Sequence, residues 1–538
     1  MYIEPGTNIR ILHNIPLDKT YDHTIYFNDA TAQRGYFIYN QKYNLSNYTY
    51  QRVQRGVARV GIKADDLYDC NYMMFQNTNY GNKWFYAFIT SVEFINNETS
   101  QITFELDVMQ TWHFDYSTDY CFVEREHTET DTIGGNILPE PVTPGEYVYN
   151  NLHPISIVED GQDVDLTTMS VIVAIVDISD QQTQAHGLRY DGIYGGAELY
   201  AFGVNNVTEI NSLISTYTRN PNAIVSIYMC PSAFIGTVDP NTHKISGTAT
   251  GKIWDYINDT PITLTDTING YLPKNAKLYT YPYNFYHVDN NSGAGLNFRY
   301  EFFGNLTPSV RISAMITQPV RAILRARNYK GSRDTAVPSE SITLSNYPLC
   351  SWSVDSYQAW VAQTSVPYAI DMIKNVTLGL GSLMSAVASQ DGGKVASAES
   401  GLLSGTFGAV MDRVKQGYQA SIATDITVGS TNNGGINVAD GTNTFYCGRC
   451  SITAQYAKMI DDFFTRFGYA VNCIKQPNRN SRPHWNYVKT AGCTLTGSVP
   501  ADDMDKICRI YDHGITFWKY GSEVGNYSLN NSLLPGRG

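Results

Sequence analysis

Residues 83–112 read KWFYAFITSVEFINNETSQITFELDVMQTW, two aromatic and β-branched runs on either side of the polar turn NNETS. The second run alternates polar side chains with apolar ones, namely Ile102, Phe104, Leu106 and Val108. A period of two is typical of a strand with one buried face and one face in water. Residues 83–112 therefore predict a β-hairpin.

The composition of the whole chain extends this β-rich character. Its 538 residues indicate three to four domains at roughly 150 residues each. Aromatic residues make up 13% of the chain, with 40 tyrosines and 43 glycines, which favours half-buried strands and tight turns over helix bundles. We predict a mostly β, multi-domain protein with an α-helical insertion.

The chain is acidic and sparsely charged. Its 38 Lys and Arg residues against 50 Asp and Glu residues give a formal net charge of -12, and only 16% of residues are charged. Nucleic-acid binders rely on clustered cations that release counterions from phosphates, so this balance disfavours sequence-reading DNA binding. A tyrosine-rich surface also fits stacking on sugars, which keeps a glycan-binding function open.

The cysteines and the first residues indicate the cellular compartment in which the chain assembles. The 9 cysteines are odd in number and scattered, which argues against a disulfide framework and favours assembly in a reducing cytoplasm. The opening MYIEPGTNIRILHNIP lacks a run of roughly 7–15 apolar residues behind a basic stretch, so we expect no secretory signal.

Glycine- and proline-rich stretches and shifts in composition divide the chain into parts. Glycines and prolines crowd residues 128–146, and because helices and central strands exclude such a composition we place a domain boundary there. The expected parts are an N-terminal β-rich part (1–130), a middle β-rich region (147–350), a connection (351–369), an apolar helical hairpin (370–425) and a C-terminal β-rich part (440–538). Within the last, SITAQYAKMIDDFFTRFG (451–468) predicts a helix, followed by alternating strands as far as Trp518.

The apolar segment 370–425 contains two uncharged runs, VTLGLGSLMSAVASQ (376–390) and SGLLSGTFGAVM (400–411), joined by a polar bend. Each is shorter than the roughly 18 apolar residues that indicate a spanning helix. At a helical period of about 3.6, each run gathers apolar side chains on one face. These are Ile373, Val376, Leu380, Leu383, Met384 and Val387 in the first arm, and Leu403, Phe407, Val410, Met411 and Val414 in the second.

These side chains need a covering surface. Exposing all of them costs on the order of 15–30 kcal/mol relative to full burial, at roughly 1.5–3 kcal/mol each. Glycines within both arms weaken the helices by about 1 kcal/mol apiece, so the helices depend on their surroundings. Two interpretations stay open: a helical hairpin packed on its own domain, and a membrane-active or lumen-filling segment.

Catalytic and metal-binding motifs are incomplete. GTATGKI (247–253) has one residue too few for a phosphate loop, and Ile253 stands where a magnesium-binding hydroxyl belongs. Cys447 and Cys450 form a single CxxC without a second pair, which disfavours a zinc site of that kind. We predict neither enzyme activity nor a metal or cofactor.

Charged side chains gather in patterns typical of strand faces. In VEREH (123–127), Glu124 and Glu126 share one face, which fits acid–base chemistry or, more often, an inter-subunit or solvated face. Basic side chains gather at Arg321, Arg325 and Arg327, and at Lys475, Arg479 and Arg482. Given the negative charge of the chain, we expect these to meet acidic neighbours rather than nucleic acid.

Longer blocks of sequence resemble a known family. The first are YMMFQNTNYGNKWFYAF (72–88), FELDVMQTW (104–112) and VEREH (123–127). The others are FGYAVNCIKQPN (467–478), NYVKTAGC (486–493), DHGITFW (512–518) and GNYS (525–528). In this order they resemble the tail-knob, or distal tail tube, proteins of small short-tailed phages of the Bacillus phage phi29 type. The middle region, 147–350, departs from the family in length and composition.

The resemblance implies a virion protein at the tail tip, assembled in the host cytoplasm as a homohexameric tube that adjoins an upstream tail or collar protein. It implies that the tube conducts the genome out of the particle, with transient passage of DNA and no specific DNA binding. It also implies that an apolar loop of each subunit plugs the lumen and later enters the host cytoplasmic membrane as a pore. The corresponding side chains here are Ile373, Val376, Leu380, Leu383, Met384, Val387, Leu403, Phe407, Val410 and Met411.

Two other classes of function compete with this one. The alternative is a host-surface adhesin of the tail tip, which binds cell-wall glycans through its tyrosine-rich surface. A cell-wall hydrolase is disfavoured, because neither paired carboxylates at a recognisable spacing nor a metal cluster stands out in the sequence.

Overall fold

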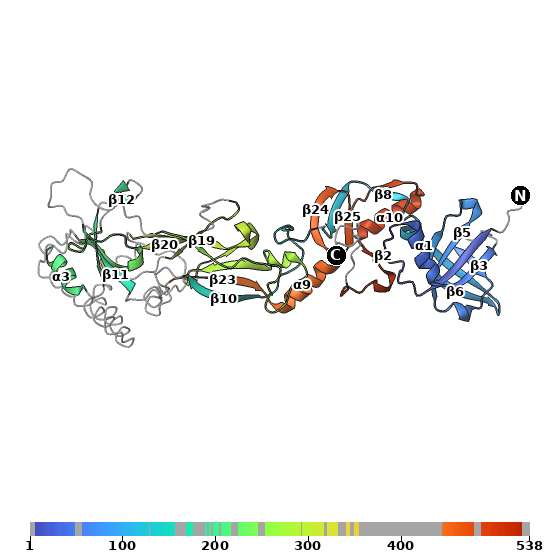
Figure 1. Cartoon of the computed structure of the whole chain (residues 1–538), viewed down its shortest axis with the longest axis horizontal. Coiled ribbons are helices and arrows are strands. Elements are labelled where there is room, and N and C mark those ends of the chain that lie inside the picture. Colours follow the sequence, from blue (N-terminus) through green and yellow to red (C-terminus); the bar gives the residue numbers. More distant parts are fainter. Residues whose placement is uncertain are drawn as a thin grey trace, which may run out of the picture. The chain divides into compact units, whose positions relative to one another are not determined.

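Two compact units make up the chain in the computed structural model. Unit 1 comprises Met1–Glu146, Leu264–Tyr283 and Ile452–Gly538, and unit 2 comprises Tyr147–Thr263 and Asn284–Ser451. Strands dominate both units (Figure 1), so the prediction of a mostly β, multi-domain protein is confirmed. The structure describes residues 6–48, 56–128, 130–155, 168–175, 189–190, 193–194, 197–203, 206–216, 224–245, 253–291, 293–316, 320–331, 341–344, 349–353, 444–477 and 486–529.

The first sheet of unit 1 is antiparallel, with the strand order β3-β1-β5-β6-β7-β4. Its strands are β1 (Thr7–His13), β3 (Gln41–Tyr48), β4 (Val57–Val60), β5 (Cys70–Asn77), β6 (Phe85–Asn96) and β7 (Thr99–Leu106). Each face buries its own apolar cluster, with Leu12 and Tyr72 on one face and Ile11 and Met73 on the other. Helix α1 (Ala30–Tyr39) covers the first face, where Phe37 stacks on Tyr72.

Strands β6 and β7 form the predicted hairpin. The strand ends at Leu106, so the prediction that Val108 continues it is wrong. The Asp107 carboxylate accepts hydrogen bonds from the backbone N–H groups of Met109 and Gln110, and this cap starts helix α2 (Val108–Thr111). Val108 is buried through the helix in a different cluster.

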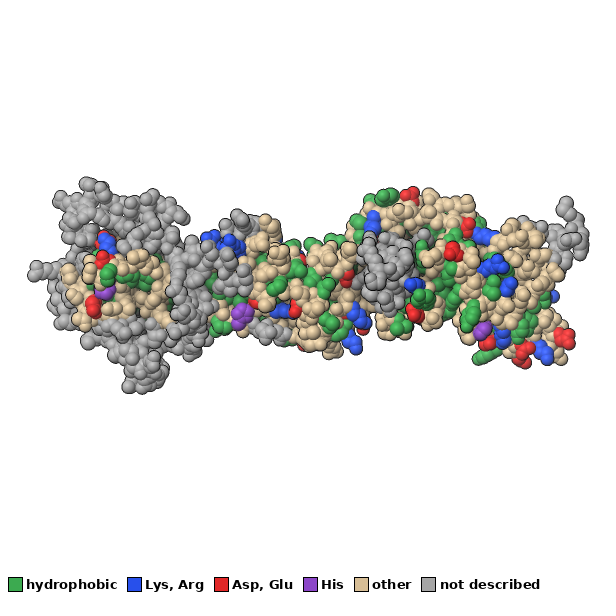
Figure 2. All heavy atoms as spheres, in the orientation of Figure 1, with side chains coloured by type: hydrophobic (Ala, Val, Ile, Leu, Met, Phe, Trp, Pro, Cys, Tyr) green, Lys and Arg blue, Asp and Glu red, His purple; other side chains and the backbone are tan. Residues whose placement is uncertain are grey.

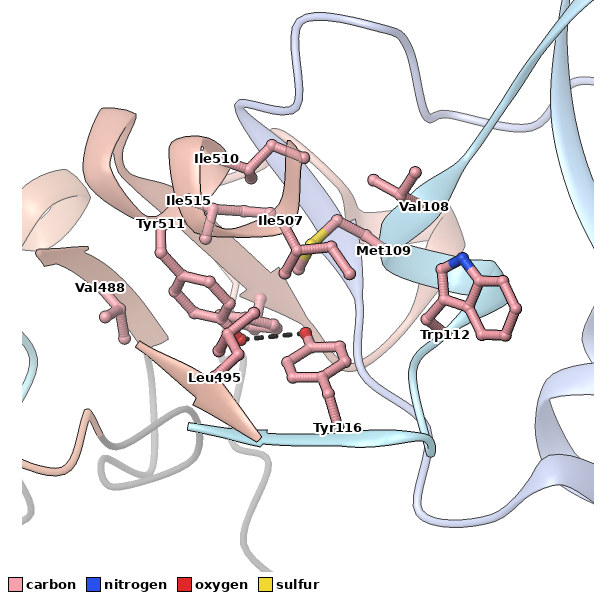
Figure 3. Close-up of a cluster of buried hydrophobic side chains, with 11 residues drawn as sticks. Val108, Met109, Trp112, Tyr116, Val488, Leu495, Ile507, Ile510, Tyr511 and Ile515 are labelled. Carbon is pink, nitrogen blue, oxygen red and sulfur yellow. Dashed lines mark hydrogen bonds between the residues drawn. The ribbon is translucent and has the colours of Figure 1, made fainter. Parts of the chain in front are cut away.

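The second sheet of unit 1 has the strand order β2-β27-β25-β9-β24. Its strands are β2 (His23–Ile25), β9 (Cys121–Glu126), β24 (Tyr469–Lys475), β25 (Asn486–Ala491) and β27 (Ile515–Trp518), while β8 (Tyr116–Thr118) pairs with β26 (Leu495–Gly497). Helix α10 (Ala501–His513) packs on β25 and α2 and closes the core drawn in Figure 3. Within this core the hydroxyls of Tyr116 and Tyr511 are 3.1 Å apart and share a hydrogen bond.

The C-terminal helices test the sequence patterns. Helix α9 (Ala454–Phe467) is the predicted one, and it ends at Gly468, whose φ of 61° and contact with the Glu126 carbonyl leave no room for a side chain. Helix α10 corrects the expectation of strands alone up to Trp518. Its acidic first turn, with Asp502 and Asp503, and its end at Gly514 are ordinary helix signals.

Unit 2 is built from small antiparallel sheets. One has the order β10-β23-β17-β18, another β14-β11-β15-β22, and a third β16-β19-β20-β21. The strands are β10 (Tyr147–Ile155), β11 (Met169–Ile175), β12 (Arg189–Tyr190), β13 (Ile193–Tyr194), β14 (Glu198–Gly203), β15 (Ile224–Pro231), β16 (Ile253–Asn258), β17 (Asn284–Asp289), β18 (Gly295–Phe298), β19 (Ser309–Met315), β20 (Arg321–Ala326), β21 (Ser341–Leu344), β22 (Leu349–Ser353) and β23 (Phe445–Ile452). Every side chain of β11 is buried, as its apolar run MSVIVAI requires.

Short elements complete the described chain. They are α3 (Val207–Thr216) and the 3-10 turns η1 (Ala64–Leu67), η2 (Thr78–Tyr80), η6 (Ser232–Phe234), η7 (Ala276–Tyr279), η8 (Tyr300–Phe302), η9 (Gly304–Leu306) and η12 (Gly521–Glu523). Within the part of the chain that the structure describes, no helix combines the length and apolar character needed to cross a bilayer.

The cap of α2 makes stability depend on pH. Burial raises the pKa of Asp107 from 3.8 to about 6, against the lowering effect of hydrogen bonds from Tyr72, Gln110 and Met109. The folded state therefore keeps a proton that the unfolded chain has released, so this contribution to stability is present below about pH 4 and lost as the pH rises through about 6. In urea denaturation, we expect the free energy of unfolding of the wild type, minus that of Asp107→Asn, to fall by on the order of 2–3 kcal/mol between about pH 4 and pH 7.

Tyr72→Phe provides a directional control. In the wild type the Tyr72 hydroxyl donates to Asp107 and lowers the pKa of that carboxyl. The substitution removes this hydroxyl and so raises the pKa of Asp107, and the fall in stability therefore extends to higher pH than in the wild type. A wild-type-minus-Asn difference that stays constant over this range contradicts the assignment.

Candidate functional site

The VEREH segment forms β9, which lies between β24 and β25 in the second sheet of unit 1. Glu124 pairs with Lys489 at 2.9 Å, and Glu126 pairs with Lys475. Glu126 is only 1% exposed, so the expectation of an inter-subunit or solvated face is wrong for this residue. The carboxylates serve as ion-pair partners within the chain, because long lysine side chains from both neighbouring strands reach them.

A buried ion cluster lies on the other side of the same strand. The Glu140 carboxylate is 0% exposed and accepts from Arg125 at 2.6 Å, from Lys277, and from the backbone N–H of Ala470 at 2.9 Å. Arg125 also donates to the carbonyl of Gly468 at 2.8 Å, where α9 ends. Burial lowers the pKa of Lys277, and Glu140 opposes this effect.

This cluster joins four segments that are distant in the sequence. Glu140 belongs to the Gly- and Pro-rich stretch 128–146, Arg125 to β9, Lys277 to η7 and Ala470 to β24. Asp131 joins the same stretch to β24 and η7 a second time. It accepts hydrogen bonds from the Tyr469 hydroxyl at 2.7 Å and from the backbone N–H of Ala276. These hydrogen bonds and ion pairs hold residues 264–283 in unit 1. The sequence prediction included the same residues in the middle region, 147–350.

Helix α9 holds the same segment through a buried carboxylate. Asp461 accepts from the Tyr271 hydroxyl at 2.7 Å, the Lys274 backbone at 2.8 Å and the Asn275 side chain at 2.6 Å. Burial raises the pKa of Asp461, and these hydrogen bonds oppose the rise. Around them Ile268, Leu278, Tyr283, Ile460 and Phe464 form an apolar cluster.

An apolar row runs from the edge strand of this sheet inward across two further strands, and it consists of Ile474, Phe122 and Ala491. The three residues are cross-strand neighbours on β24, β9 and β25. Ile474 is 74% exposed and Phe122 is 39% exposed, and Ala491 is exposed as well. Figure 2 shows hydrophobic side chains reaching the surface at several places on unit 1. An apolar row that crosses three strands and stays exposed among the described residues is typical of a surface that another chain covers.

A second exposed apolar site lies at the end of β6. Beyond Ile89 strand β6 carries no buried residue, and Phe94 and Ile95 are exposed, Phe94 to 64%. Within the part of the chain that the structure describes, no core covers these side chains, so the hairpin end fits an arm that packs on a neighbouring molecule. The sequence predicted the hairpin but did not indicate which of its aromatic side chains stay in solvent.

Most sequence-predicted functional residues fall outside the described residues. The ten side chains predicted to plug a lumen or enter a membrane, from Ile373 to Met411, lie within residues 354–443. Residues 247–252 of the phosphate-loop-like stretch, Arg479 and Arg482 lie outside as well. Arg321 and Arg325 are exposed on β20, on the shared strand face that the sequence predicted.

The described part of the chain holds one group of metal-binding side chains. His153, Asp259 and Cys447, all in unit 2, place one donor atom each within 4.8 Å of the others. Cys450, the other half of the CxxC, is three positions further along β23 and therefore points to the opposite face of the strand. The sequence offered no signal for this group, because its members are far apart in the chain.

Comparisons with known proteins agree with the long sequence blocks. The family model described as Bacillus phage phi29, Tail knob protein gp9, C-terminal domain, matches residues 242–532, more than half of the chain. The chain belongs to this tail knob protein family. A second model, Caudoviral major tail protein N-terminus, matches residues 5–117, which hold the six-stranded sheet. The resemblance inferred from the sequence blocks is confirmed.

The similarity to individual tail knob proteins runs along nearly the whole chain. Tail knob protein gp9 of Bacillus phage phi29 is 27% identical, over 98% of this chain and 99% of the relative. Tail knob protein gp9 of Bacillus phage PZA is 28% identical over the same shares. The solved tail knob protein gp12 of bacteriophage C1 matches 98% of this chain and 100% of its own, with a TM-score of 0.62 and 15% identity, and shows the same fold. This tail knob protein is thus a structural component of a phage tail.

The ion cluster yields a stability prediction for the tail knob protein. Glu140→Ala leaves Arg125 and Lys277 as buried cations without their carboxylate, and breaking a buried pair in this way costs roughly 3–5 kcal/mol. We expect unit 1 to unfold at a clearly lower urea concentration. The fluorescence of Trp112, measured against urea concentration, monitors this transition.

Glu124→Ala is the matched control on the same strand. Its ion pair with Lys489 is more than a third exposed on the Glu124 side, and such pairs contribute below about 1 kcal/mol. Equal effects of the two substitutions contradict the central role assigned to Glu140.

Proposed function

We propose that this tail knob protein forms a tube of six copies at the tail tip, through which the genome leaves the particle. Membership in the tail knob family carries the proposal, and the match of the first sheet to a major tail protein supports it. Closure into a ring covers the same surface patch on every copy, so each copy needs two complementary faces. An adjoining upstream tail or collar protein completes the conduit.

The apolar row supplies one of these faces. Strand β24 is an edge strand, and its exposed Ile474 extends the sheet's apolar surface to the last strand. The bulge between Ala470 and Cys473, with Asn472 at a φ of 44°, interrupts the edge and limits unspecific strand pairing. The row then contacts a neighbouring copy through side chains, flanked by the Glu124–Lys489 ion pair.

The apolar segment 370–425 supplies the plug and the pore. In this proposal its ten apolar side chains, Ile373 to Met411, pack together in the lumen before ejection and against lipid in the host cytoplasmic membrane afterwards. Both states bury the same side chains, so a difference in stability alone decides between them. Assembly in the host cytoplasm fits such a switch, because the segment stays covered until the particle meets a cell.

We expect Ile474→Asp to prevent ring formation without unfolding the chain. A charge at the centre of a contact costs at least about 2 kcal/mol, which weakens each contact roughly 30-fold. Analytical ultracentrifugation and negative-stain microscopy report the assembly, and circular dichroism reports the fold.

Ile474→Val is the position-matched control, because it keeps the apolar surface and should keep the ring. Rings of normal abundance with Ile474→Asp rule out the apolar row as a contact between copies, while leaving the conduit itself open to a different interface.

The plug-and-pore role predicts loss of membrane activity. Leu380→Asp combined with Phe407→Asp should abolish dye leakage from vesicles of phosphatidylethanolamine and phosphatidylglycerol, since a charge at bilayer depth costs roughly 2.5–3.5 kcal/mol. Rings should still form, as microscopy can verify.

Ser382→Asp combined with Ser404→Asp adds the same charges away from the apolar faces and should leave leakage close to that of the wild type. Undiminished leakage with the Leu380 and Phe407 substitutions removes the pore function from this segment.

A further inference from the structure

Three donor side chains from separate segments of unit 2 meet at one point. His153 lies on β10, Asp259 directly follows β16, and Cys447 lies on β23. The Cys447 Sγ is 3.4 Å from the His153 Nε2, which in turn is 3.7 Å from the Asp259 Oδ2. Strands β10 and β23 belong to one sheet and β16 to another, so the three side chains bridge two sheets.

These separations match the first coordination sphere of zinc. Zinc binds thiolate sulfur at about 2.3 Å and imidazole nitrogen or carboxylate oxygen at about 2.0 Å, in tetrahedral geometry. Two ligand atoms of one tetrahedral ion are therefore roughly 3.3–3.5 Å apart. Two of the observed distances, 3.4 and 3.7 Å, fit a shared ion, and all three donor atoms lie within 4.8 Å of one another, so the Asp259 and Cys447 side chains need to turn inward to hold one ion.

The kinds of donor select among metals. A thiolate with an imidazole and one carboxylate suits zinc, whereas magnesium and calcium prefer oxygen ligands alone. The Tyr286 side chain, from the neighbouring strand β17, lies near both Cys447 and Asp259. A metal ion binds cysteine as the thiolate, so binding at Cys447 releases the thiol proton.

The site is buried on one side and open to solvent on the other, so an ion can reach it. Cys447 is fully buried, whereas the His153 side chain is 50% exposed and the Asp259 side chain 24% exposed. The exposed imidazole can therefore bind an ion from solvent, and the buried sulfur then coordinates the same ion. We propose that His153, Asp259 and Cys447 bind one zinc ion per chain, with water as the fourth ligand, and that this ion fastens the β10–β23 sheet to the end of β16.

Cobalt titration of the full-length chain, stripped of metal with a chelator, tests the proposal. We expect one equivalent of cobalt to bind and to give a thiolate-to-cobalt charge-transfer band, which zinc then abolishes. Cys447→Ser should lose the band, and His153→Ala should lose it or weaken cobalt binding by at least ~100-fold. Since the His153 side chain is half exposed, its variant should fold even where the Cys447 variant does not.

His287→Ala is the matched control. The His287 Nε2 is also 3.7 Å from a carboxylate, that of Asp289, but among the described residues this pair does not belong to a group of three metal-binding side chains. The variant should bind cobalt like the wild type. Absence of the band in the wild type, or full binding with an unchanged band in either the Cys447 or the His153 variant, overturns the proposal.

Discussion

The buried Glu140 carboxylate is the constraint on which unit 1 depends. A carboxylate removed from water is tolerated only where cations and N–H groups replace its hydration, and here Arg125, Lys277 and the Ala470 backbone do so. Each partner comes from a different segment, so the carboxylate can be satisfied only when the linker, β9, η7 and β24 are all in place. The cluster thus specifies how separated pieces of chain assemble, whatever its net contribution to stability.

This constraint explains how unit 1 tolerates long excursions of the chain. The chain leaves unit 1 after Glu146, returns for Leu264–Tyr283, and returns finally at Ile452. Buried carboxylates secure both returns: Glu140 and Asp461 hold the segment Leu264–Tyr283, and Glu140 also holds Ala470 of the final return. The partly buried Asp131 adds a further hydrogen bond to η7. Because Ala470 is held by Glu140, the edge strand β24 and its exposed Ile474 are positioned by the same interactions. Sequence can therefore vary in the excursions while the edge of unit 1 keeps its geometry.

Local patterns predicted local structure, and they failed where a single polar side chain overrode them. The period of two predicted the hairpin of β6 and β7, and the period of 3.6 predicted α9. Alternation continues through Val108 and predicts a strand there, but the Asp107 cap starts a helix. Helix α10 was missed although its acidic first turn and Gly514 were visible. Glu140 and Lys277 are 137 residues apart, and no period links them, so their pairing could not be predicted. The lumen-plug residues stay a prediction from sequence.

The ion pairs of unit 1 also bear on the proposed role as a conduit for DNA. Arg125, Lys277, Lys475 and Lys489 are all paired with carboxylates of the same unit, so their charge is not free for phosphate contacts. The formal net charge of -12 adds repulsion at long range. Duplex DNA that makes few counterion-releasing contacts is held weakly, which a conduit requires. Arg321 and Arg325 are exposed on β20, and a lumen lined with such guanidinium groups would slow the genome. We therefore expect that face of β20 to meet an acidic protein surface outside the proposed conduit.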